Sequence, residues 1–283
     1  SDLEDAVTDQ PEDFPRIQGY RLQSVLGEGG FGIVYAATQL EPIQRELALK
    51  VLKFGSENQQ VVARFEAERQ ALALMNHPGI AKIHDAGQTL TGAPWVAMDR
   101  IDGKPVTVVA KLKSWSLPKR LEVFLEICDA VRHAHQRGVI HRDLKPSNVL
   151  VSEAADGITR SHLIDFGIAR AVDQPLTDRT IVTQWFQFLG TPSYMSPEQT
   201  ELRSSQLDTR SDVYSLGVLL FELLTGELPF PADAEKPHDQ LLQEIRESDP
   251  PKPSSRSADF SKQLRGDLAV SYTHLRAHET FGY

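Results

Sequence analysis

A glycine-rich stretch near the start of the chain, residues 27–32 (GEGGFG), constrains the fold more than any other feature. Glycines at this spacing let the backbone close around a polyphosphate and point N–H groups at it. A dinucleotide-binding fold uses similar spacing, but in that fold a helix follows the glycines directly. Here a strand-like run, residues 33–37 (IVYAA), follows them. The stretch therefore predicts a turn between two short strands and argues against the dinucleotide-binding fold.

The remaining sequence divides into a strand-rich part and a helix-rich part. Strands are predicted at 20–25, 33–37, 47–52, 80–83 and 95–98. One helix is predicted among them, at 62–75, where apolar residues recur at helical spacing. After a turn expected at Asp102-Gly103, helices are predicted at 117–137, 213–225 and 237–247. The fold class is therefore α+β, with a small β-rich lobe followed by a larger helical lobe.

Composition excludes several classes of function. The 283 residues carry 30 Lys and Arg against 39 Asp and Glu, a formal net charge of −9, so the basic excess typical of nucleic-acid binders is missing. The one cysteine, Cys128, excludes an intramolecular disulfide framework and fits a reducing cytoplasm. The longest apolar stretch, Val213–Leu224, contains Glu222 and is too short to span a bilayer. We therefore expect no nucleic-acid partner, no membrane segment in this chain and a cytoplasmic location.

Acidic residues concentrate at the N-terminus. Residues 1–13 contain six Asp and Glu and no Lys or Arg, and they have little apolar content. We expect residues 1–19 to form a disordered acidic tail. An acidic arm that docks a partner is the alternative interpretation.

Three further motifs concentrate polar and charged side chains. Residues 141–148 (HRDLKPSN) place a carboxylate, two cations and an amide within one loop. Residues 165–167 (DFG) follow a strand-like segment, and residues 190–198 (GTPSYMSPE) come after them. Upstream, Lys50 lies in an apolar strand pattern, where a lysine is unusual unless its ammonium group meets an anion. The alternative is an edge-strand lysine whose side chain reaches water.

In this order and spacing, the motifs resemble those of a eukaryotic-type (Hanks-type) protein kinase catalytic domain. The chain is most similar to bacterial Ser/Thr protein kinases, and the resemblance runs from about Tyr20 to Leu268. It implies a bilobal protein kinase-like fold, ATP and Mg²⁺ as cofactors, and proteins with Ser or Thr as substrates. The implied reaction is transfer of the ATP γ-phosphoryl group to a Ser or Thr hydroxyl.

The resemblance implies a nucleotide site in the first part of the chain. Gly27, Gly29 and Gly32 would cover the ATP phosphates. Lys50 would hold the α- and β-phosphates and pair with Glu68, for which Glu66 is the competing candidate. The residues that would surround adenine, including the gatekeeper Met98 and a hinge at 99–101, are Val34, Ala48, Met98, Asp99, Ile101 and Leu150.

The resemblance also implies a catalytic loop. Asp143 would accept the proton of the substrate hydroxyl, and Asn148 and Asp165 would hold Mg²⁺. Lys145 marks the Ser/Thr class of the family and would touch the γ-phosphate. Thr191 would bridge Asp143 and Lys145.

Regulation is implied by the neighbours of the catalytic loop. Arg142 precedes Asp143, and in the family this arginine reads a phosphate on the activation segment. Three threonines in that segment are candidate autophosphorylation sites, which would require self-association for reaction in trans: Thr177, Thr180 and Thr183. A hydrophobic spine anchored by Asp212 is also implied, formed by Leu72, Ile83, His141 and Phe166.

The sequence changes character near its C-terminus. Residues 270–283 carry no helical stripe and resemble a translated sequencing-library transposon end, so we expect them to be non-native. The expected parts are a tail at 1–19, a kinase N-lobe at 20–103, a C-lobe at 104–269 that lacks its last helices, and the foreign tail at 270–283. In the family, Glu198 pairs with an arginine from those last helices, and we expect its carboxylate to lack that partner here.

Two other functions stay open on sequence alone. The first is a pseudokinase-like binding scaffold or an inactive truncated fragment, against which the presence of Lys50, Asp143, Asn148 and Asp165 argues. The second is a small-molecule kinase of related fold, which the segment 191–198 disfavours. The resemblance also leaves open a membrane tether in a longer, full-length protein.

Overall fold

The structure is a computed structural model, and it describes residues 10–11, 13–30, 32–53, 75–153, 157–166, 192–200, 208–232, 237–256, 260 and 262–264. The described residues form two units. The first unit holds those up to Asn76 together with Ala81–Asp102, and the second holds His77–Ile80 and those from Gly103 onward.

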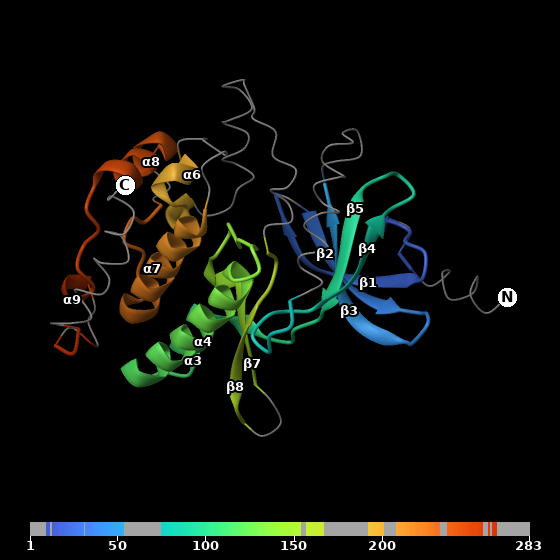
Figure 1. The fold of residues 1–283 in the computed structure, drawn as a ribbon, viewed down its shortest axis with the longest axis horizontal. Coiled ribbons are helices and arrows are strands. Elements are labelled where there is room, and N and C mark those ends of the chain that lie inside the picture. The colour runs from blue at the N-terminus through green and yellow to red at the C-terminus, as the bar shows by residue number, and fades with distance from the viewer. Residues whose placement is uncertain are drawn as a thin grey trace. The chain divides into compact units, whose positions relative to one another are not determined.

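The first unit is built on a five-stranded antiparallel sheet in the order β1-β2-β3-β5-β4 (Figure 1). The strands are β1 (Tyr20–Gly29), β2 (Gly32–Gln39), β3 (Arg45–Leu52), β4 (Ile83–Gln88) and β5 (Pro94–Asp99). Alternate side chains of β1, β2 and β3 form an apolar core on one face, in which Leu22, Leu47 and Leu49 are almost fully buried. Burial of these large side chains stabilises the unit, at about 25 cal/mol for each Å² of apolar surface removed from water.

Residues just before β1 belong to this core, although the sequence predicts disorder through residue 19. Ile17 is buried, and the ring of Phe14 contacts that of Tyr35 with centroids 4.9 Å apart. Gln10 accepts a hydrogen bond from the Leu22 N–H through Oε1, at 3.0 Å. The sequence prediction weighed the acidic residues of this segment and overlooked Phe14 and Ile17. These two apolar side chains pack against the core of the sheet.

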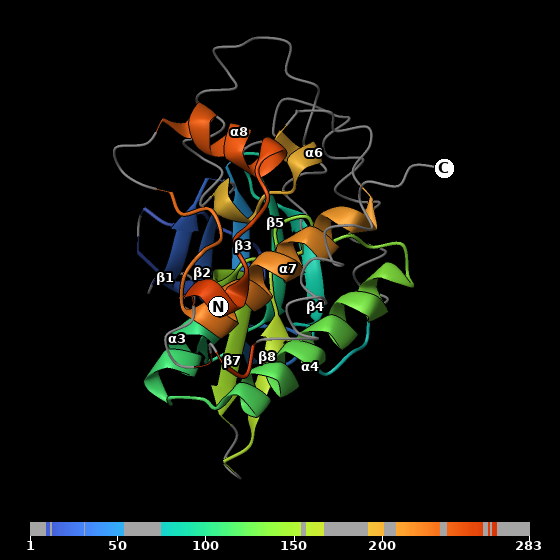
Figure 2. The ribbon, with the colours of Figure 1, turned by 90° about the vertical axis from the view of Figure 1, so that its left-hand side faces the viewer.

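The second unit is mainly helical. Its helices are α3 (Val106–Leu112), α4 (Leu117–His135), α6 (Pro197–Thr200), α7 (Thr209–Thr225), α8 (His238–Glu247) and α9 (Pro253–Arg256). It also contains a small antiparallel sheet in the order β6 (Lys104–Pro105), β7 (Val149–Glu153) and β8 (Thr159–Leu163), with short 3₁₀ turns η1 (Pro146–Asn148) and η3 (Pro192–Tyr194). Figure 2 shows α7 lying beside α4, and α8 packs against α6 and η3.

Helix α7 is buried along most of its length, as its almost uniformly apolar sequence predicts. Its N-terminus is capped by Asp208, whose side chain accepts the Arg210 N–H at 2.7 Å. It ends at Gly226, which adopts a left-handed conformation with φ 79°. Within the part of the chain that the structure describes, no helix has the length and apolar character needed to cross a membrane.

Most of the predicted elements in the described ranges are confirmed. The helix predicted at 62–75 lies outside the described residues except for Met75. The strand predicted at 80–83 begins only at Ile83, because Ile80 instead forms an isolated bridge to Leu163 in the second unit. Helix α3 was not predicted, because its valines favour strands; it forms with Val106, Val109 and Ala110 buried on one face.

We predict that Gly32→Ala destabilises the protein by about 1–3 kcal/mol, because a Cβ atom at residue 32 would lie 2.4 Å from the Val51 carbonyl oxygen. Gly29→Ala is the matched control, since its Cβ atom would meet nothing within 4 Å, and its unfolding free energy should change by less than about 0.5 kcal/mol. Urea denaturation of both variants checks this prediction. Equal stability of the two variants would contradict it.

Candidate active site

One face of the first unit's sheet gathers four of the residues that the sequence analysis assigns to nucleotide binding. In the strand register Val34 lies opposite Lys50, and Ala48 lies opposite Met98. Directly opposite residues share a face, and this face is the reverse of the one that carries Leu47 and Leu49. Lys50 is only 6% exposed. The sheet thus places an ammonium group on the same face as Val34, Ala48 and Met98, as a site for an anionic ligand with an apolar moiety requires.

The glycine-rich stretch forms the end of the β1–β2 hairpin, as predicted. Gly27 pairs with Val34, and Gly29 pairs with Gly32. Gly32 is required by packing against the backbone of β3. Cβ atoms on Gly27 and Gly29 would meet no atom of the described residues within 4 Å, so packing against those residues gives no reason for glycine at these two positions. Bare backbone there leaves N–H groups accessible to a ligand.

The segment at 99–101 continues from the end of β5. Asp99 pairs with Leu47 of β3, and its backbone N–H donates to the Lys82 carbonyl at 3.0 Å. The Asp99 carboxylate contacts His84 Nε2 at 2.6 Å and accepts the Lys82 N–H at 3.0 Å. Ile101 is half-buried. The Asp99 side chain is therefore engaged by the sheet, and backbone groups are what the segment can offer to a ligand.

In the second unit, the loop after α4 brings three of the predicted catalytic residues together. Lys145 Nζ lies 2.9 Å from Asp143 Oδ2. Asn148 Nδ2 donates to the Asp143 carbonyl at 2.8 Å and to Asp143 Oδ2 at 3.1 Å. The turn η1 provides this geometry, because it folds Asn148 back toward Asp143. A half-buried carboxylate held by two donors is suited to accept a proton in a fixed direction.

Asn148 and Asp165 lie at the same end of the β7–β8 hairpin. Asn148 directly precedes β7, Asp165 follows β8, and the two strands are antiparallel. The Ile164 N–H donates to the Asn148 carbonyl at 3.0 Å, which closes this end of the hairpin. Leu150 lies in β7 opposite His162. Amide and carboxylate oxygens are the donor types that Mg²⁺ prefers, so the donor set fits this ion.

Two residues beside these groups adopt the left-handed backbone conformation, which is uncommon for residues other than glycine. They are Arg142, with φ 65°, and Asp165, with φ 62°. Such strain costs on the order of 1–3 kcal/mol and concentrates at functional sites. The sequence carries no signal for it at Arg142, whereas aspartate, as at Asp165, adopts this conformation more often than most residues do.

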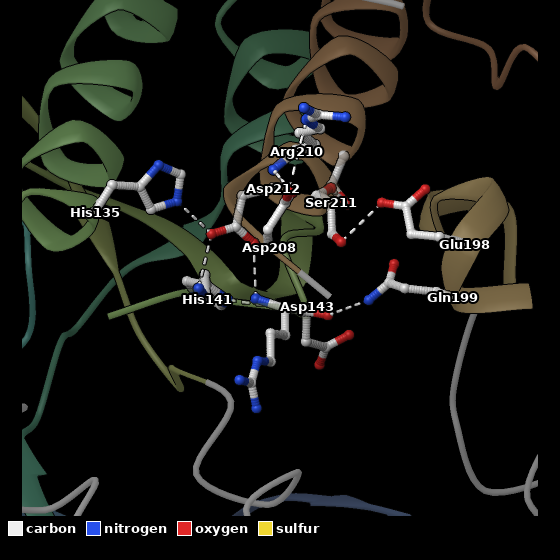
Figure 3. A network of polar contacts seen from close by, with 11 residues as sticks. His135, His141, Asp143, Glu198, Gln199, Asp208, Arg210, Ser211 and Asp212 are labelled. Atoms are coloured by element: carbon white, nitrogen blue, oxygen red, sulfur yellow. Dashed lines mark hydrogen bonds and ion pairs between the residues drawn. The ribbon is translucent and has the colours of Figure 1, made fainter. Parts of the chain in front are cut away.

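The buried carboxylate of Asp212 anchors the catalytic loop (Figure 3). Asp212 lies in the first turn of α7 and is 0% exposed. It accepts the backbone N–H groups of His141 and Arg142, each at 2.7 Å, and contacts His135 Nε2 at 2.7 Å. The His141 ring also packs against Phe166, with centroids 4.6 Å apart. Of the implied spine, Leu72 lies outside the described residues.

The segment around α6 is tied to the same loop. Gln199 Nε2 donates to the Arg142 carbonyl at 2.9 Å (Figure 3). Gln199 Oε1 also accepts the Ser196 N–H at 2.9 Å. Glu198 is half-buried and accepts a hydrogen bond from the Ser211 hydroxyl at 2.8 Å, so a partner from within the described chain satisfies one of its oxygens. The roles of Gln199, Ser211 and His135 were not predicted, because these contacts depend on tertiary packing.

Several predicted residues lie outside the described residues. They are Glu66, Glu68, Thr177, Thr180, Thr183 and Thr191. Cys128, the one cysteine of the sequence, is half-buried, and burial raises the pKa of its thiol to about 11, so the thiol stays protonated and is a poor nucleophile.

Comparison with known proteins agrees with this geometry. The sequence matches the family described as the protein kinase domain over residues 20–274. Serine/threonine-protein kinase PknB of Mycobacterium tuberculosis is 39% identical over 250 residues, which cover 87% of this chain and 38% of PknB. Serine/threonine-protein kinase pkn3 of Myxococcus xanthus is 38% identical over 218 residues, which cover 76% of this chain and 39% of that protein. The chain therefore spans less than half the length of these relatives.

A solved structure is also similar. The crystal structure of a mutant PknI kinase domain from Mycobacterium tuberculosis matches with a TM-score of 0.64 and 26% sequence identity. The match covers 92% of this chain and 97% of that structure.

We predict that Asp212→Ala destabilises the protein by about 3 kcal/mol or more, because two backbone N–H groups lose their buried acceptor. Asp212→Asn keeps one oxygen acceptor and should lose about half as much. Asp208→Ala on the same helix removes only a cap and should cost about 1 kcal/mol. Urea unfolding of the three variants checks the order, and equal losses would rule out the anchoring role.

A second prediction concerns the pH dependence of stability. Glu222 of α7 accepts a hydrogen bond from the Tyr194 hydroxyl, and burial raises the pKa of its carboxyl from 4.5 to about 7. The folded protein therefore holds this proton more tightly than the unfolded chain. The stabilisation is complete below about pH 4.5 and is lost as the pH rises through about 7. Stability should fall across that window by on the order of 2 kcal/mol.

Glu222→Gln keeps a hydrogen-bonding group and should flatten this part of the stability profile. The exposed Glu247→Gln is the control and should leave the slope unchanged. Denaturant unfolding at intervals from pH 4.5 to 8 measures both. A Glu222→Gln profile parallel to that of the wild type would show that Glu222 does not cause the slope.

Proposed function

The chain belongs to the protein kinase domain family, and we propose that it acts as a serine/threonine protein kinase that transfers the γ-phosphoryl group of ATP to Ser and Thr hydroxyls of proteins. Its fold, with an antiparallel sheet in one unit and helices in the other, is the protein kinase fold. Members of the family use ATP and Mg²⁺. The observation that carries the proposal is the grouping of Asp143, Lys145 and Asn148 in one loop.

We assign nucleotide binding to the first unit's sheet and to Leu150. Lys50 is positioned to neutralise phosphate charge, and Gly27, Gly29 and Gly32 keep bare backbone at the hairpin end. The apolar residues assigned to the adenine ring are Val34, Ala48, Met98 and Leu150. The backbone of Asp99 and Ile101 supplies the polar contacts that orient adenine, since the Asp99 side chain is already engaged. Glu68 is assigned as the partner of Lys50.

We assign proton transfer to Asp143. Its carboxylate accepts the proton of the substrate hydroxyl as that oxygen attacks the γ-phosphorus, and the bond from phosphorus to the ADP oxygen breaks. Asn148 Nδ2 and Lys145 Nζ fix the direction of the carboxylate. Lys145 also places a positive charge where the transferring phosphoryl group carries negative charge. Thr191 is assigned to the bridge between Asp143 and Lys145.

Asn148 and Asp165 are the residues that would hold Mg²⁺. Their oxygen donors lie at one end of the β7–β8 hairpin, and the left-handed conformation of Asp165 is consistent with a side chain aimed by the backbone. When bound, the ion neutralises phosphate charge and orients the phosphates.

We further infer partners and location from the reaction. The substrates are proteins with accessible Ser or Thr. They include a second copy of the chain itself, which would be phosphorylated in trans, after self-association, on Thr177, Thr180 or Thr183. A phosphate there would be read by Arg142. The cytoplasm supplies ATP, and the single cysteine suits its reducing conditions, so we place the kinase domain there.

We predict that Asp143→Asn lowers phosphoryl transfer about 10²- to 10⁴-fold, because the proton acceptor is lost, while Mg·ATP affinity changes little. The measurement is transfer from radiolabelled ATP to a Ser/Thr peptide library and to the chain itself. Asp129→Asn is the matched control: Asp129 is also a hydrogen-bonded carboxylate of the second unit, but it lies on α4, away from the catalytic loop.

Full activity in Asp143→Asn would exclude Asp143 as the proton acceptor. A wild-type chain that binds Mg·ATP but transfers no phosphate would instead support the binding-scaffold function.

A further inference from the structure

His84 of β4 lies between a cation and a carboxylate in the first unit. Its Nδ1 is 3.0 Å from Arg45 Nη1, and its Nε2 is 2.6 Å from Asp99 Oδ1. The His84 side chain is only 13% exposed, whereas that of Asp99 is 42% exposed. The contact therefore joins a half-buried imidazole to a carboxylate at the start of the hinge.

The partners of His84 select one tautomer of its ring. An arginine can only donate hydrogen bonds, so Nδ1 must be the acceptor and carry no proton. Nε2 then carries the proton and donates a hydrogen bond to Asp99 Oδ1. Arg45 is itself fixed, because its Nε donates to Gln39 Oε1 at 2.6 Å. A chain of directed hydrogen bonds thus runs from β2 through β3 and β4 to the last residue of β5.

This chain of hydrogen bonds ends on the residue from which the hinge begins. The second carboxylate oxygen of Asp99 accepts the Lys82 N–H, and the Asp99 N–H donates to the Lys82 carbonyl, both at 3.0 Å. The next residue, Arg100, is held to Glu46 of β3 at 3.2 Å. Side-chain contacts to the sheet therefore determine where the backbone of the hinge lies.

We propose that His84 is a positioning residue for nucleotide binding: by holding the Asp99 carboxylate, it fixes the hinge backbone that contacts the adenine. The inference rests on the proposed function, in which Asp99 and Ile101 orient adenine through backbone groups. Adenine affinity depends on preorganised hydrogen-bonding groups, because disorder at the hinge must be removed when the nucleotide binds. Phosphoryl transfer itself depends on groups of the second unit, so His84 should affect affinity for the nucleotide and leave the turnover number almost unchanged.

The test compares variants that differ in the hydrogen bonds of residue 84. His84→Phe keeps a planar ring but cannot donate to Asp99, and it should raise both the Kd for Mg·ADP and the KM for ATP about three- to tenfold. The kcat and the KM for the peptide substrate should stay within about twofold. His84→Gln retains an N–H donor and should recover most of the affinity.

His77→Phe is the matched control. His77 belongs to the second unit, its side chain is 15% exposed, and its Nε2 lies 3.1 Å from Asp129 Oδ2. Its Nδ1 accepts the Gly79 N–H at 3.0 Å, so this ring also lies between a donor and a carboxylate. Loss of the contact between His77 and Asp129 should lower thermal stability about as much as His84→Phe does, without changing nucleotide affinity.

A double-mutant cycle tests whether His84 acts through Asp99. If it does, His84→Phe should add almost nothing to the loss of Mg·ADP affinity caused by Asp99→Ala. Calorimetry measures Mg·ADP binding without phosphoryl transfer, and thermal unfolding confirms that each variant is folded. Wild-type affinity in a folded His84→Phe variant, or additive losses in the cycle, would overturn this inference and leave the proposed kinase function standing. A wild-type chain that binds no nucleotide would overturn both.

Discussion

The catalytic loop depends on one buried carboxylate. Asp212 has no exposure to water, and its carboxylate contacts three donors, two of them backbone N–H groups of the loop itself. The same contact holds Arg142 in a left-handed conformation that an isolated peptide would rarely adopt. Since Asp143 follows Arg142 directly, its backbone is placed next to a residue that α7 holds. The geometry of the catalytic loop therefore depends on the position of α7, which carries Asp212.

In the first unit the equivalent constraint is the alternation of side chains along β3. Leu47 and Leu49 face the apolar core, and this leaves Ala48 and Lys50 on the opposite face with Val34 and Met98. A slip of one residue in the register would exchange the two faces and bury Lys50 in the core. Packing of the core thus selects the arrangement of the face that we assign to the nucleotide.

The sequence predicted those parts of the fold that local patterns determine. The strands β2, β3 and β5 and the helices α4, α7 and α8 follow from periodicity, turns and caps, and the loop at 141–148 follows from its unusual composition. Helix α3 was missed because burial of one face overrode the strand preference of its valines. The contact of His84 with Asp99 and the donors around Asp212 could not be predicted, since they join residues far apart in the sequence through the register of the strands and the packing of helices.

The glycines of the β1–β2 hairpin have two different explanations, one for Gly32 and the other for Gly27 and Gly29. Gly32 is fixed by the carbonyl of Val51, whereas internal packing leaves Gly27 and Gly29 unconstrained. Packing of the fold therefore constrains Gly32, whereas the phosphate contact that we propose would constrain Gly27 and Gly29. A related chain that bound no nucleotide could replace Gly27 and Gly29 while its hairpin stayed intact, but the backbone of β3 would still require glycine at position 32.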